Sequence, residues 1–293
     1  MSQLNKVLRG IREASRIALG KKTAGRNLTV FPDDVFIVSY PRSGNTWTRF
    51  LIGNLLSPQK PVTFANVETM VPEIYLFPDR VLRQLPRPRL LKSHECFDPR
   101  YKSIIYIVRD PRDVAVSYYH YAIKREWIAD KYPIDEFVRR LLTAEFDVRA
   151  RWAAAWDDHV LSWISTRRGK PGFLLLRYED MLQDPEQALS DIVRLLNLNA
   201  SDDRLSRAVQ LSSADHMRDL EQSEGKHWLL TKNTRQDKPF VRTAKIGGWR
   251  SELPKQSVAE IEAAWGEVME SVGYKLTSGV SPMVTVNQRI VAG

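Results

Sequence analysis

Short runs of apolar residues recur along the chain, and each is followed by a segment with helical spacing. Residues 35–38, 104–108 and 173–176 form such runs and are expected to be buried strands. From Trp47 onward, apolar residues return at three- and four-residue spacing, which indicates an amphipathic helix. Strands that alternate with helices predict a single α/β domain, with a central and mostly parallel sheet flanked by helices on both faces.

The turn after the first of these strands combines helix-capping residues with a cation. Pro41 and Gly44 interrupt regular structure, and the segment from Ser43 to Thr46 leads into the helix. Backbone N–H groups at a helix N-terminus favour an anion, and Arg42 adds a planar fork of donors. A phosphate or a sulfate is therefore the expected ligand, although an ordinary turn with a surface arginine has the same residues. The G-x-x-x-x-G-K-[ST] pattern is absent, so no Lys-Ser or Lys-Thr pair follows Gly44 to hold a metal ion.

A second group of polar residues follows a short apolar pair at residues 90–91, which indicates another strand. Lys92, Ser93 and His94 stand at its expected end. Ligands gather at the carboxyl ends of parallel strands. Because the unperturbed pKa of histidine lies near neutrality, His94 is a candidate general base as well as a candidate structural residue.

A third group repeats the strand–turn–helix arrangement of the first. Asp110 can cap a helix and Pro111 suits its first turn. Arg109 precedes them at the end of a strand, and Ser117 lies two helical turns further on. These two side chains can hold one phosphate together, unless Arg109 pairs with Asp110 or Asp113 instead.

Two long connections are candidates for the rest of a binding site. Residues 57–88 are rich in proline and aromatic residues and form either a pocket wall or a surface covering. Residues 221–250 are polar and loop-like, as in a lid.

Composition limits the possible partners. The net charge of +9 and the isoelectric point near 9.6 favour anionic ligands. No recognised DNA- or RNA-binding motif occurs, and a polyanionic nucleotide accounts for part of the charge. With Cys96 as the single cysteine, no intrachain disulfide can form, and the absence of a membrane span or secretory leader predicts a cytoplasmic protein.

Residues 1–27 differ from the rest of the chain. They carry an apolar helical stripe and seven Lys and Arg residues against Glu13 alone, a net charge of +6. Such a basic amphipathic helix either lies at the surface of an anionic membrane or packs on the domain with a solvated face. We therefore expect three parts, a basic N-terminal helix at 1–27, the α/β domain at 28–275 and a tail at 276–293.

Four ordered segments resemble the PAPS-dependent sulfotransferases, over about residues 33 to 275. The stretch YPRSGNTW is similar to the phosphosulfate loop Y-P-K-S-G-T-T-W of the cytosolic members, with Arg42 for Lys and Asn45 for Thr. Lys92-Ser93-His94 resembles K-[ST]-H, and the segment from Arg109 to Ser117 resembles the 3′-phosphate segment. The run that begins at Tyr178 resembles the Y-E-D strand end.

A further segment, near the end of the domain, matches its family pattern only in part. The family pattern here is R-K-G-x-x-G-D-W-K, and Arg242, Gly247 and Trp249 match it. Thr243, Ala244 and Gly248 depart from its Lys, Gly and Asp. The dimerisation pattern K-x-x-x-T-V-x-x-x-E is not evident, so the oligomeric state stays open.

This resemblance implies a P-loop-like domain that transfers a sulfuryl group in line from PAPS to an acceptor hydroxyl or amine, releasing PAP, without a metal. The acceptor would be a small molecule, a carbohydrate or a lipid-linked compound. Arg42 would hold the 5′ phosphate and the bridging oxygen, Lys92 would neutralise the sulfuryl oxygens, and His94 would take the proton of the acceptor. The implied binding residues are Ser43, Gly44, Asn45 and Thr46 in the loop, Trp47 and Tyr178 around the adenine, and Arg109, Ser117 and Arg242 at the 3′ phosphate.

Two rival functions remain at the level of sequence. One is a P-loop-like nucleotide or small-molecule kinase, against which the missing Lys-Ser/Thr pair argues. The other is a binding module that keeps a PAP site without transferring a group.

Overall fold

A four-stranded parallel sheet forms the centre of the protein. The computed structural model describes residues 23–143 and 153–279. The strands lie in the order β2-β1-β3-β4, and each neighbouring pair is parallel, which confirms the predicted α/β architecture. Their bounds are Val35–Ser39 for β1, Leu90–Ser93 for β2, Ser103–Val108 for β3 and Phe173–Arg177 for β4.

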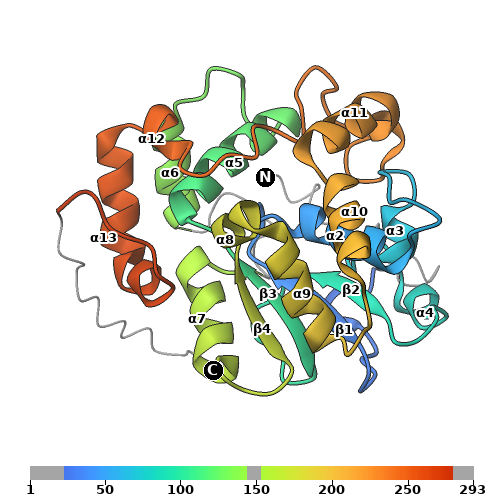
Figure 1. Ribbon diagram of the computed structural model, residues 1–293. Helices are drawn as coiled ribbons and strands as arrows, with labels where there is room; N and C mark the ends of the chain where they lie inside the picture. The colour runs from blue at the N-terminus through green and yellow to red at the C-terminus, as the bar shows by residue number, and fades with distance from the viewer. Residues whose placement is uncertain (1–22, 144–152, 280–293) are drawn as a thin grey trace, which may run out of the picture.

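Helices cover both faces of this sheet (Figure 1). One face packs against α5 (Pro111–Lys124), α6 (Ile134–Leu142), α7 (Trp156–Arg167) and α13 (Lys255–Ser271). The other packs against α2 (Asn45–Leu56), α8 (Tyr178–Gln183), α9 (Pro185–Leu195) and α10 (Asp202–Gln210). The remaining helices are α3 (Val67–Met70), α4 (Asp79–Leu82), α11 (Ala214–Glu224), α12 (Trp249–Glu252) and the 3-10 turns Gly25–Asn27 and Gly225–His227.

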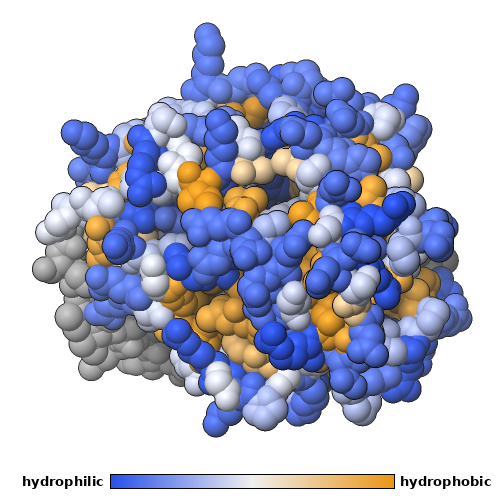
Figure 2. All heavy atoms as spheres, in the orientation of Figure 1, coloured by the Kyte–Doolittle hydropathy of each residue, from blue (hydrophilic) through white to orange (hydrophobic). Residues whose placement is uncertain are grey.

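The central strands are apolar along their whole length because both of their faces are buried. In β1, Phe36 and Val38 join the core under α5 and α7, whereas Val35 and Ile37 join the core under α2 and α9. At the edge, β4 is less covered, and apolar side chains show between α7 and α9 in the space-filling view (Figure 2).

Capping residues set where two of the helices begin, and the sequence predicts the first of these starts, at Asp110. The Asp110 side chain accepts the N–H of Arg112 at the start of α5, and the Asp184 side chain accepts the N–H of Gln187 at the start of α9. In each case a proline occupies the first helical turn, where its missing N–H has no partner to lose. The start of α5 fixes the direction in which Ser117 projects.

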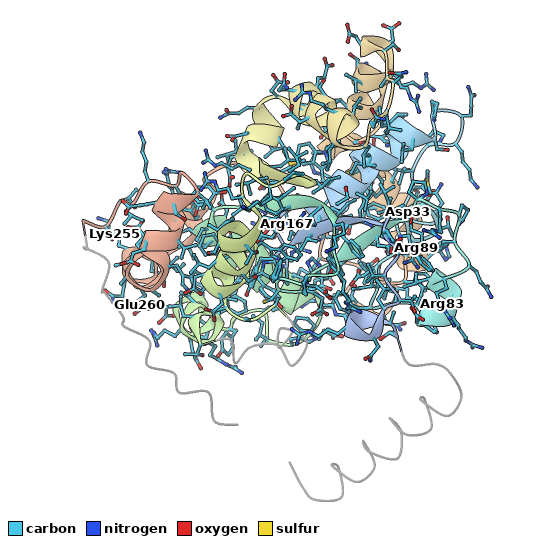
Figure 3. All side chains as sticks on the ribbon, turned by 90° about the horizontal axis from the view of Figure 1, so that it is seen from below. Asp33, Arg83, Arg89, Arg167, Lys255 and Glu260 are labelled. Carbon is cyan, nitrogen blue, oxygen red and sulfur yellow. The ribbon has the colours of Figure 1, made fainter. Side chains whose placement is uncertain are left out.

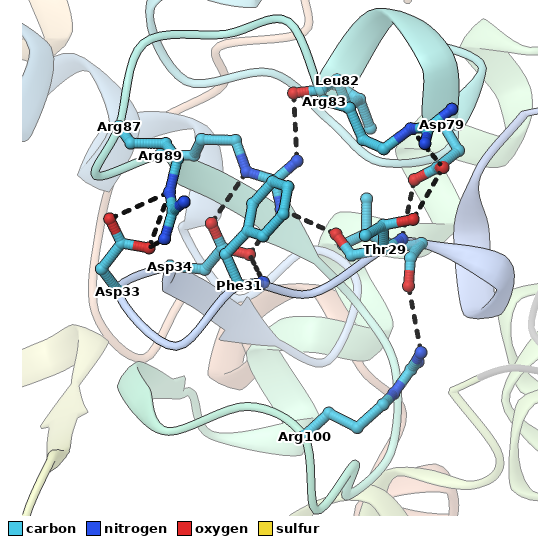
Figure 4. A network of polar contacts seen from close by, with 11 residues as sticks. Thr29, Phe31, Asp33, Asp34, Asp79, Leu82, Arg83, Arg87, Arg89 and Arg100 are labelled. Atoms are coloured by element: carbon cyan, nitrogen blue, oxygen red, sulfur yellow. Dashed lines mark hydrogen bonds and ion pairs between the residues drawn. The ribbon is translucent and has the colours of Figure 1, made fainter.

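A buried ion pair joins the beginnings of β1 and β2 (Figure 4). Arg89 Nε lies 2.8 Å from Asp34 Oδ1, and neither side chain is exposed to solvent. Arg89 also donates to the carbonyl oxygens of Leu82 and Thr29 at 3.0 and 2.8 Å. Because a buried charge left without its partner costs about 3–5 kcal/mol, this pair holds the two strands together. In Figure 3 Arg89 lies on the opposite side of the molecule from Lys255 on α13.

The sequence predicts that the domain runs from residue 28 to residue 275, but described residues just outside both bounds also pack on it. Residues 23–27 form a short irregular piece and a 3-10 turn that pack on the domain, with Ala24 buried and Arg26 paired with Glu95 at 2.6 Å. Residues 1–22, which carry most of the predicted basic helix, lie outside the described residues. At the other end, Thr277 donates its backbone N–H to Glu262 at 2.9 Å, so the tail is attached up to this point. Within residues 23–143 and 153–279, no helix is long and apolar enough to span a bilayer.

Candidate active site

A large cavity opens where the four strands end. Its volume is about 1120 Å³, slightly above the range of about 300–1,000 Å³ that is common for small-molecule sites. It is lined by residues at or just after the ends of β1, β2, β3 and β4, among them Arg42, Lys92, Arg109 and Tyr178. Because the chain leaves β1 for β2 on one side and returns to β3 on the other, a crevice is expected at this point. Figure 2 shows the surface hollowed in the region of α5 and α11.

The loop after β1 has an unusual backbone conformation and leads into the start of α2 at the edge of the cavity. Arg42 and Gly44 have positive φ angles of 70° and 97°. A Cβ atom on Gly44 would lie 2.4 Å from a ring carbon of Tyr178, so glycine is required here for space as well as for conformation. The first hydrogen bond of α2 is from Thr48 N–H to the Gly44 carbonyl, which leaves the preceding N–H groups without an intrahelical acceptor.

Two polar side chains of this loop turn inward. Asn45 donates through Nδ2 to the Ile37 carbonyl at 3.1 Å and to Ser39 Oγ at 3.2 Å, so its amide ties the loop to β1. Ser43 is fully buried, and its hydroxyl has no hydrogen-bond partner in the described part of the chain. Of all the predicted site residues, Ser43 is the one that does not line the cavity.

The guanidinium of Arg42 lies between two aromatic rings. It is 4.6 Å from the ring centroids of both Tyr121 and Phe240, and Nε is 3.2 Å from Ser117 Oγ. Burial lowers the pKa of Arg42 to about 10, with a further lowering from Arg109, and the group stays charged at neutral pH. Arg42 therefore contacts the residue that the sequence assigns to the 3′ phosphate.

The guanidinium of Arg109 is the second cation of the cavity. It stacks on the ring of Tyr178 at 4.4 Å and donates to the Arg42 carbonyl oxygen at 3.1 Å. Its Nε atom is buried without a partner in residues 23–143 and 153–279. Asp110 pairs with Arg112 instead, and Asp113 accepts backbone N–H groups, so Arg109 forms no ion pair with either carboxylate.

At the end of β2, Lys92 forms a buried ion pair. Its Nζ lies 2.6 Å from Glu73 Oε2, and only 6% and 10% of the two side chains are exposed. Burial lowers the pKa of Lys92, and the neighbouring Glu73 opposes this change. Glu73 comes from the proline-rich connection at residues 57–88, which thereby supplies one wall of the cavity together with Tyr75 and Leu76.

His94 has a defined tautomer. Its Nδ1 lies 2.6 Å from the Ser39 carbonyl oxygen, which can only accept, so Nδ1 carries the proton. Nε2 is then left with its lone pair, and no described residue donates to it. Burial lowers the pKa of His94 well below 6.5, followed by the charge of Lys92, so the ring is neutral at pH 7.

The two aromatic residues predicted around the adenine touch each other. The rings of Trp47 and Tyr178 meet edge to face with centroids 5.7 Å apart. A base stacked between two rings needs about 7 Å between them, twice the usual contact distance of about 3.5 Å. These rings therefore form a corner of the cavity and not the two sides of a slot. Trp47 is fixed there by a 2.9 Å hydrogen bond from Nε1 to the Ser212 carbonyl.

The loop at residues 242–249 is anchored to α5. Asp113 accepts the N–H groups of Gly247 at 2.7 Å and Trp249 at 2.9 Å. Ala244, where the family pattern has Gly, has a φ of 48°, the left-handed conformation that glycine adopts without strain. Arg242 lines the cavity and is paired with Glu252 at 2.7 Å.

Several lining residues were missed in the sequence. Ser212, Ser213, Ala214 and Met217 line the cavity at the start of α11, and Phe240 covers Arg42. Ser213 caps α11 through the N–H of His216, so a helix start was detectable. No local pattern indicates that this start faces the cavity. Among the described residues, no cluster of His, Cys, Asp and Glu is arranged to hold a metal ion.

A parallel sheet with arginine-bearing turns at the carboxyl ends of its strands defines a P-loop-like α/β protein. The sulfotransferase domain model matches residues 32–273, and the chain therefore belongs to the sulfotransferase family. It is an enzyme that transfers a sulfuryl group, as the resemblance of its motifs predicted.

Known relatives cover most of the chain. Mouse sulfotransferase 1B1 is 27% identical over 265 residues, which covers 85% of this chain and 87% of that protein. Cytosolic sulfotransferase 12 of Arabidopsis thaliana is 29% identical over 270 residues, covering 84% and 80%.

Solved structures share the fold. Retinol dehydratase in complex with retinol and PAP superposes with a TM-score of 0.68 at 19% identity, covering 87% of this chain and 86% of that one. Mouse sulfotransferase SULT7A1 complexed with PAP gives a TM-score of 0.65 at 22% identity, covering 84% and 87%.

Proposed function

We propose that the protein transfers a sulfuryl group from PAPS to a hydroxyl or an amine, with His94 as general base. The observation that carries this proposal is that Arg42 and Arg109 both face the cavity without a carboxylate partner among the described residues. Both guanidinium groups line one cavity, and neither forms an ion pair with any described residue. Two adjacent cations without a carboxylate partner favour a ligand with more than one anionic group.

The residues fit such a nucleotide at both of its ends. At the loop after β1, the N–H groups at the start of α2 have no intrahelical acceptor and can hold one phosphate. Arg109, with its unpartnered Nε, and Ser117 lie on the adjacent strand end and helix, where a second phosphate is expected. When bound, PAPS would supply the sulfuryl group and leave as PAP.

The chemical step would be carried by charge stabilisation and proton removal. Lys92, as an ammonium, would neutralise charge on the sulfuryl oxygens, and Arg42 would stabilise the oxygen whose bond to sulfur breaks. Nε2 of His94 would take the acceptor's proton while the new bond to sulfur forms. These groups are held by the ends of β1 and β2, so catalysis rests mainly on positioning and electrostatics.

The acceptor subsite is expected next to His94. Tyr75 stacks beside His94, and the same cavity is also lined by the aromatic side chains of Tyr118, Tyr121 and Trp127. Such walls favour a small molecule with an apolar or aromatic body, and a carbohydrate or lipid-linked acceptor is a further candidate. A screen of phenols, alcohols and amines with ³⁵S-labelled PAPS should yield at least one labelled product. Tight PAP binding with no labelled product from any class would indicate a binding module instead.

We also propose that the protein is cytoplasmic and that residues 1–27 contact an anionic membrane. The net charge of +6 and the apolar stripe of this segment support the proposal. Because Ala24 is buried and Arg26 pairs with Glu95, the test should remove residues 1–22 only. The shortened protein should no longer co-sediment with vesicles rich in phosphatidylserine, and its turnover of a water-soluble acceptor should not change. A full-length chain that ignores such vesicles at low salt would contradict the proposal.

A further inference from the structure

The buried pair between Glu73 and Lys92 is not part of the family motifs that the sequence shows. Residues 71–75 run beside β2 as an extra edge segment. Glu73 is bridged to Lys92, the Lys92 N–H donates to the Pro72 carbonyl at 2.9 Å, and the Ile74 N–H donates to the Lys92 carbonyl at 3.2 Å. Directly paired residues project to the same side, and here both side chains reach the cavity.

The surroundings of Lys92 oppose its positive charge. Burial lowers its pKa, and Arg49, which is fully buried on α2, acts in the same direction. Two carboxylates act against this. Glu73 contacts the ammonium directly at 2.6 Å, whereas Glu68 is paired with Arg49 at 2.8 Å. His94, the other titratable neighbour at the end of β2, is neutral and supplies no counter-charge.

A second buried network fixes the position of Glu73. Its backbone N–H donates to Glu68 Oε2 at 3.0 Å, and Glu68 Oε1 accepts from Trp228 Nε1 at 3.2 Å. The backbone of Glu73 is therefore attached to α3 through Glu68, and to α2 through the pair of Glu68 with Arg49. One oxygen of the Glu73 carboxylate binds Lys92, and no described residue donates to the other.

We propose that Glu73 is a positioning residue that keeps Lys92 protonated and directed into the cavity for sulfuryl transfer. This inference rests on the proposed role of Lys92. Glu73 itself does not touch the reacting atoms. Its carboxylate supplies the counter-charge that a buried ammonium needs, and its single hydrogen bond leaves the other two donors of Nζ available for the sulfuryl oxygens.

The test uses Glu73→Gln, which keeps the shape of the side chain and removes its charge. At pH 6 its turnover should remain within a few-fold of the parent. As the pH rises toward 9, Lys92 loses its proton and turnover should fall by about 10²-fold, the usual effect of losing one charge-stabilising donor. The parent should keep its activity over this range. Glu73→Asp, which restores the charge, should restore the alkaline activity.

A matched control separates this role from a purely structural one. Glu68→Gln removes a neighbouring buried carboxylate whose ion-pair partner is Arg49 and not Lys92. It should lower stability and give a much smaller alkaline loss than Glu73→Gln, because Glu68 acts on Lys92 only from a distance, whereas Glu73 contacts the ammonium directly. An equal loss in Glu68→Gln, or a uniform change of Glu73→Gln turnover at every pH, would overturn the inference, as would a gain of activity in Glu73→Gln.

The protonation of Lys92 can also be read without turnover. Labelling of the PAP-free protein with acetic anhydride, followed by mass spectrometry of the peptide that contains Lys92, reports its reactivity against pH. Half-maximal labelling should occur at a lower pH in Glu73→Gln than in the parent. If labelling shifts and no acceptor is turned over, the inference holds and the proposed function fails. If turnover is seen and labelling does not shift, the inference fails alone.

Discussion

Nδ1 of His94 lies 2.6 Å from the carbonyl oxygen of Ser39, the last residue of β1. This contact joins the phosphosulfate-type loop, which begins just after Ser39, to the candidate base at the end of β2. It fixes the imidazole tautomer, so that the basic nitrogen Nε2 is the one without a donor. If the imidazole were turned over about its bond to Cβ, a ring carbon would face this carbonyl in place of Nδ1, and the hydrogen bond would be lost. The contact with β1 therefore also fixes the orientation of the ring.

The first prediction concerns selection of the nucleotide by Arg109. PAP should raise the melting temperature by several degrees more than AMP or ATP, because only PAP offers a phosphate at the 3′ position. Arg109→Ala should remove this preference, since a hydrogen bond to a charged group contributes about 1.5–3 kcal/mol. Differential scanning fluorimetry at matched ligand concentrations measures the effect.

Arg80→Ala provides the control for that measurement. Arg80 is exposed on α4 and does not line the cavity, so its removal should leave the order of the three ligands unchanged. Equal shifts for PAP, AMP and ATP in the parent protein would exclude a 3′-phosphate site at Arg109.

A second prediction uses the strained backbone of Ala244. Its φ of 48° costs a residue with a Cβ atom about 1–2 kcal/mol in the folded state. Glycine avoids this cost, but it lowers stability by about 0.4–1 kcal/mol because it gives the unfolded chain more conformational entropy. Ala244→Gly should therefore raise the free energy of unfolding by about 0.5–1 kcal/mol. The matched change Ala259→Gly, inside helix α13, should lower it by about the same amount. Urea denaturation of the two variants compares the signs, and destabilisation by both would show that Ala244 is not strained.

The third prediction is a loss of stability in mild acid that depends on His159. This ring is fully buried against Tyr106, and burial lowers its pKa to about 3, against about 6.5 in the unfolded chain. Between these values the unfolded state binds more protons, so stability falls as the pH falls. From pH 7 to pH 5 the loss from this group should be about 2 kcal/mol, at about 1.4 kcal/mol per unit.

His159→Gln should show a smaller loss between pH 7 and pH 5 than the parent, whatever its stability at pH 7. The exposed His227 gives the matched comparison, because His227→Gln should keep the slope of the parent. If His159→Gln keeps that slope as well, the buried ring does not control the acid response.

The strands and the turns that carry Arg42 and Arg109 were predictable because they depend on residues that are neighbours in the sequence. Apolar runs define β1, β3 and β4, and Asp110 with Pro111 defines the start of α5. Local patterns predicted that the carboxyl ends of the strands would form the site, and Arg42 and Arg109 follow from that topology.

Other features depend on contacts between distant segments. Glu73 lies in an irregular connection and pairs with Lys92 through one isolated β-bridge. No periodic pattern in the sequence predicts this contact. The corner formed by Trp47 and Tyr178 depends on the clearance at Gly44. The pairing of Arg242 with Glu252 depends on how the loop at 242–249 folds back over α5.

The central claim is that His94 removes the proton of the acceptor, and turnover of His94→Ala tests it most directly. General-base catalysis contributes about 10²–10⁴-fold, so kcat should fall by that factor while PAP affinity stays within a few-fold. His227→Ala, at an exposed position, should retain the kcat of the parent. In the parent, activity should decline only well below pH 6.5, where His94 becomes protonated, and this acid limb should be missing in His94→Ala. A folded His94→Ala protein with near-normal kcat, or with the acid limb of the parent, would contradict the assignment.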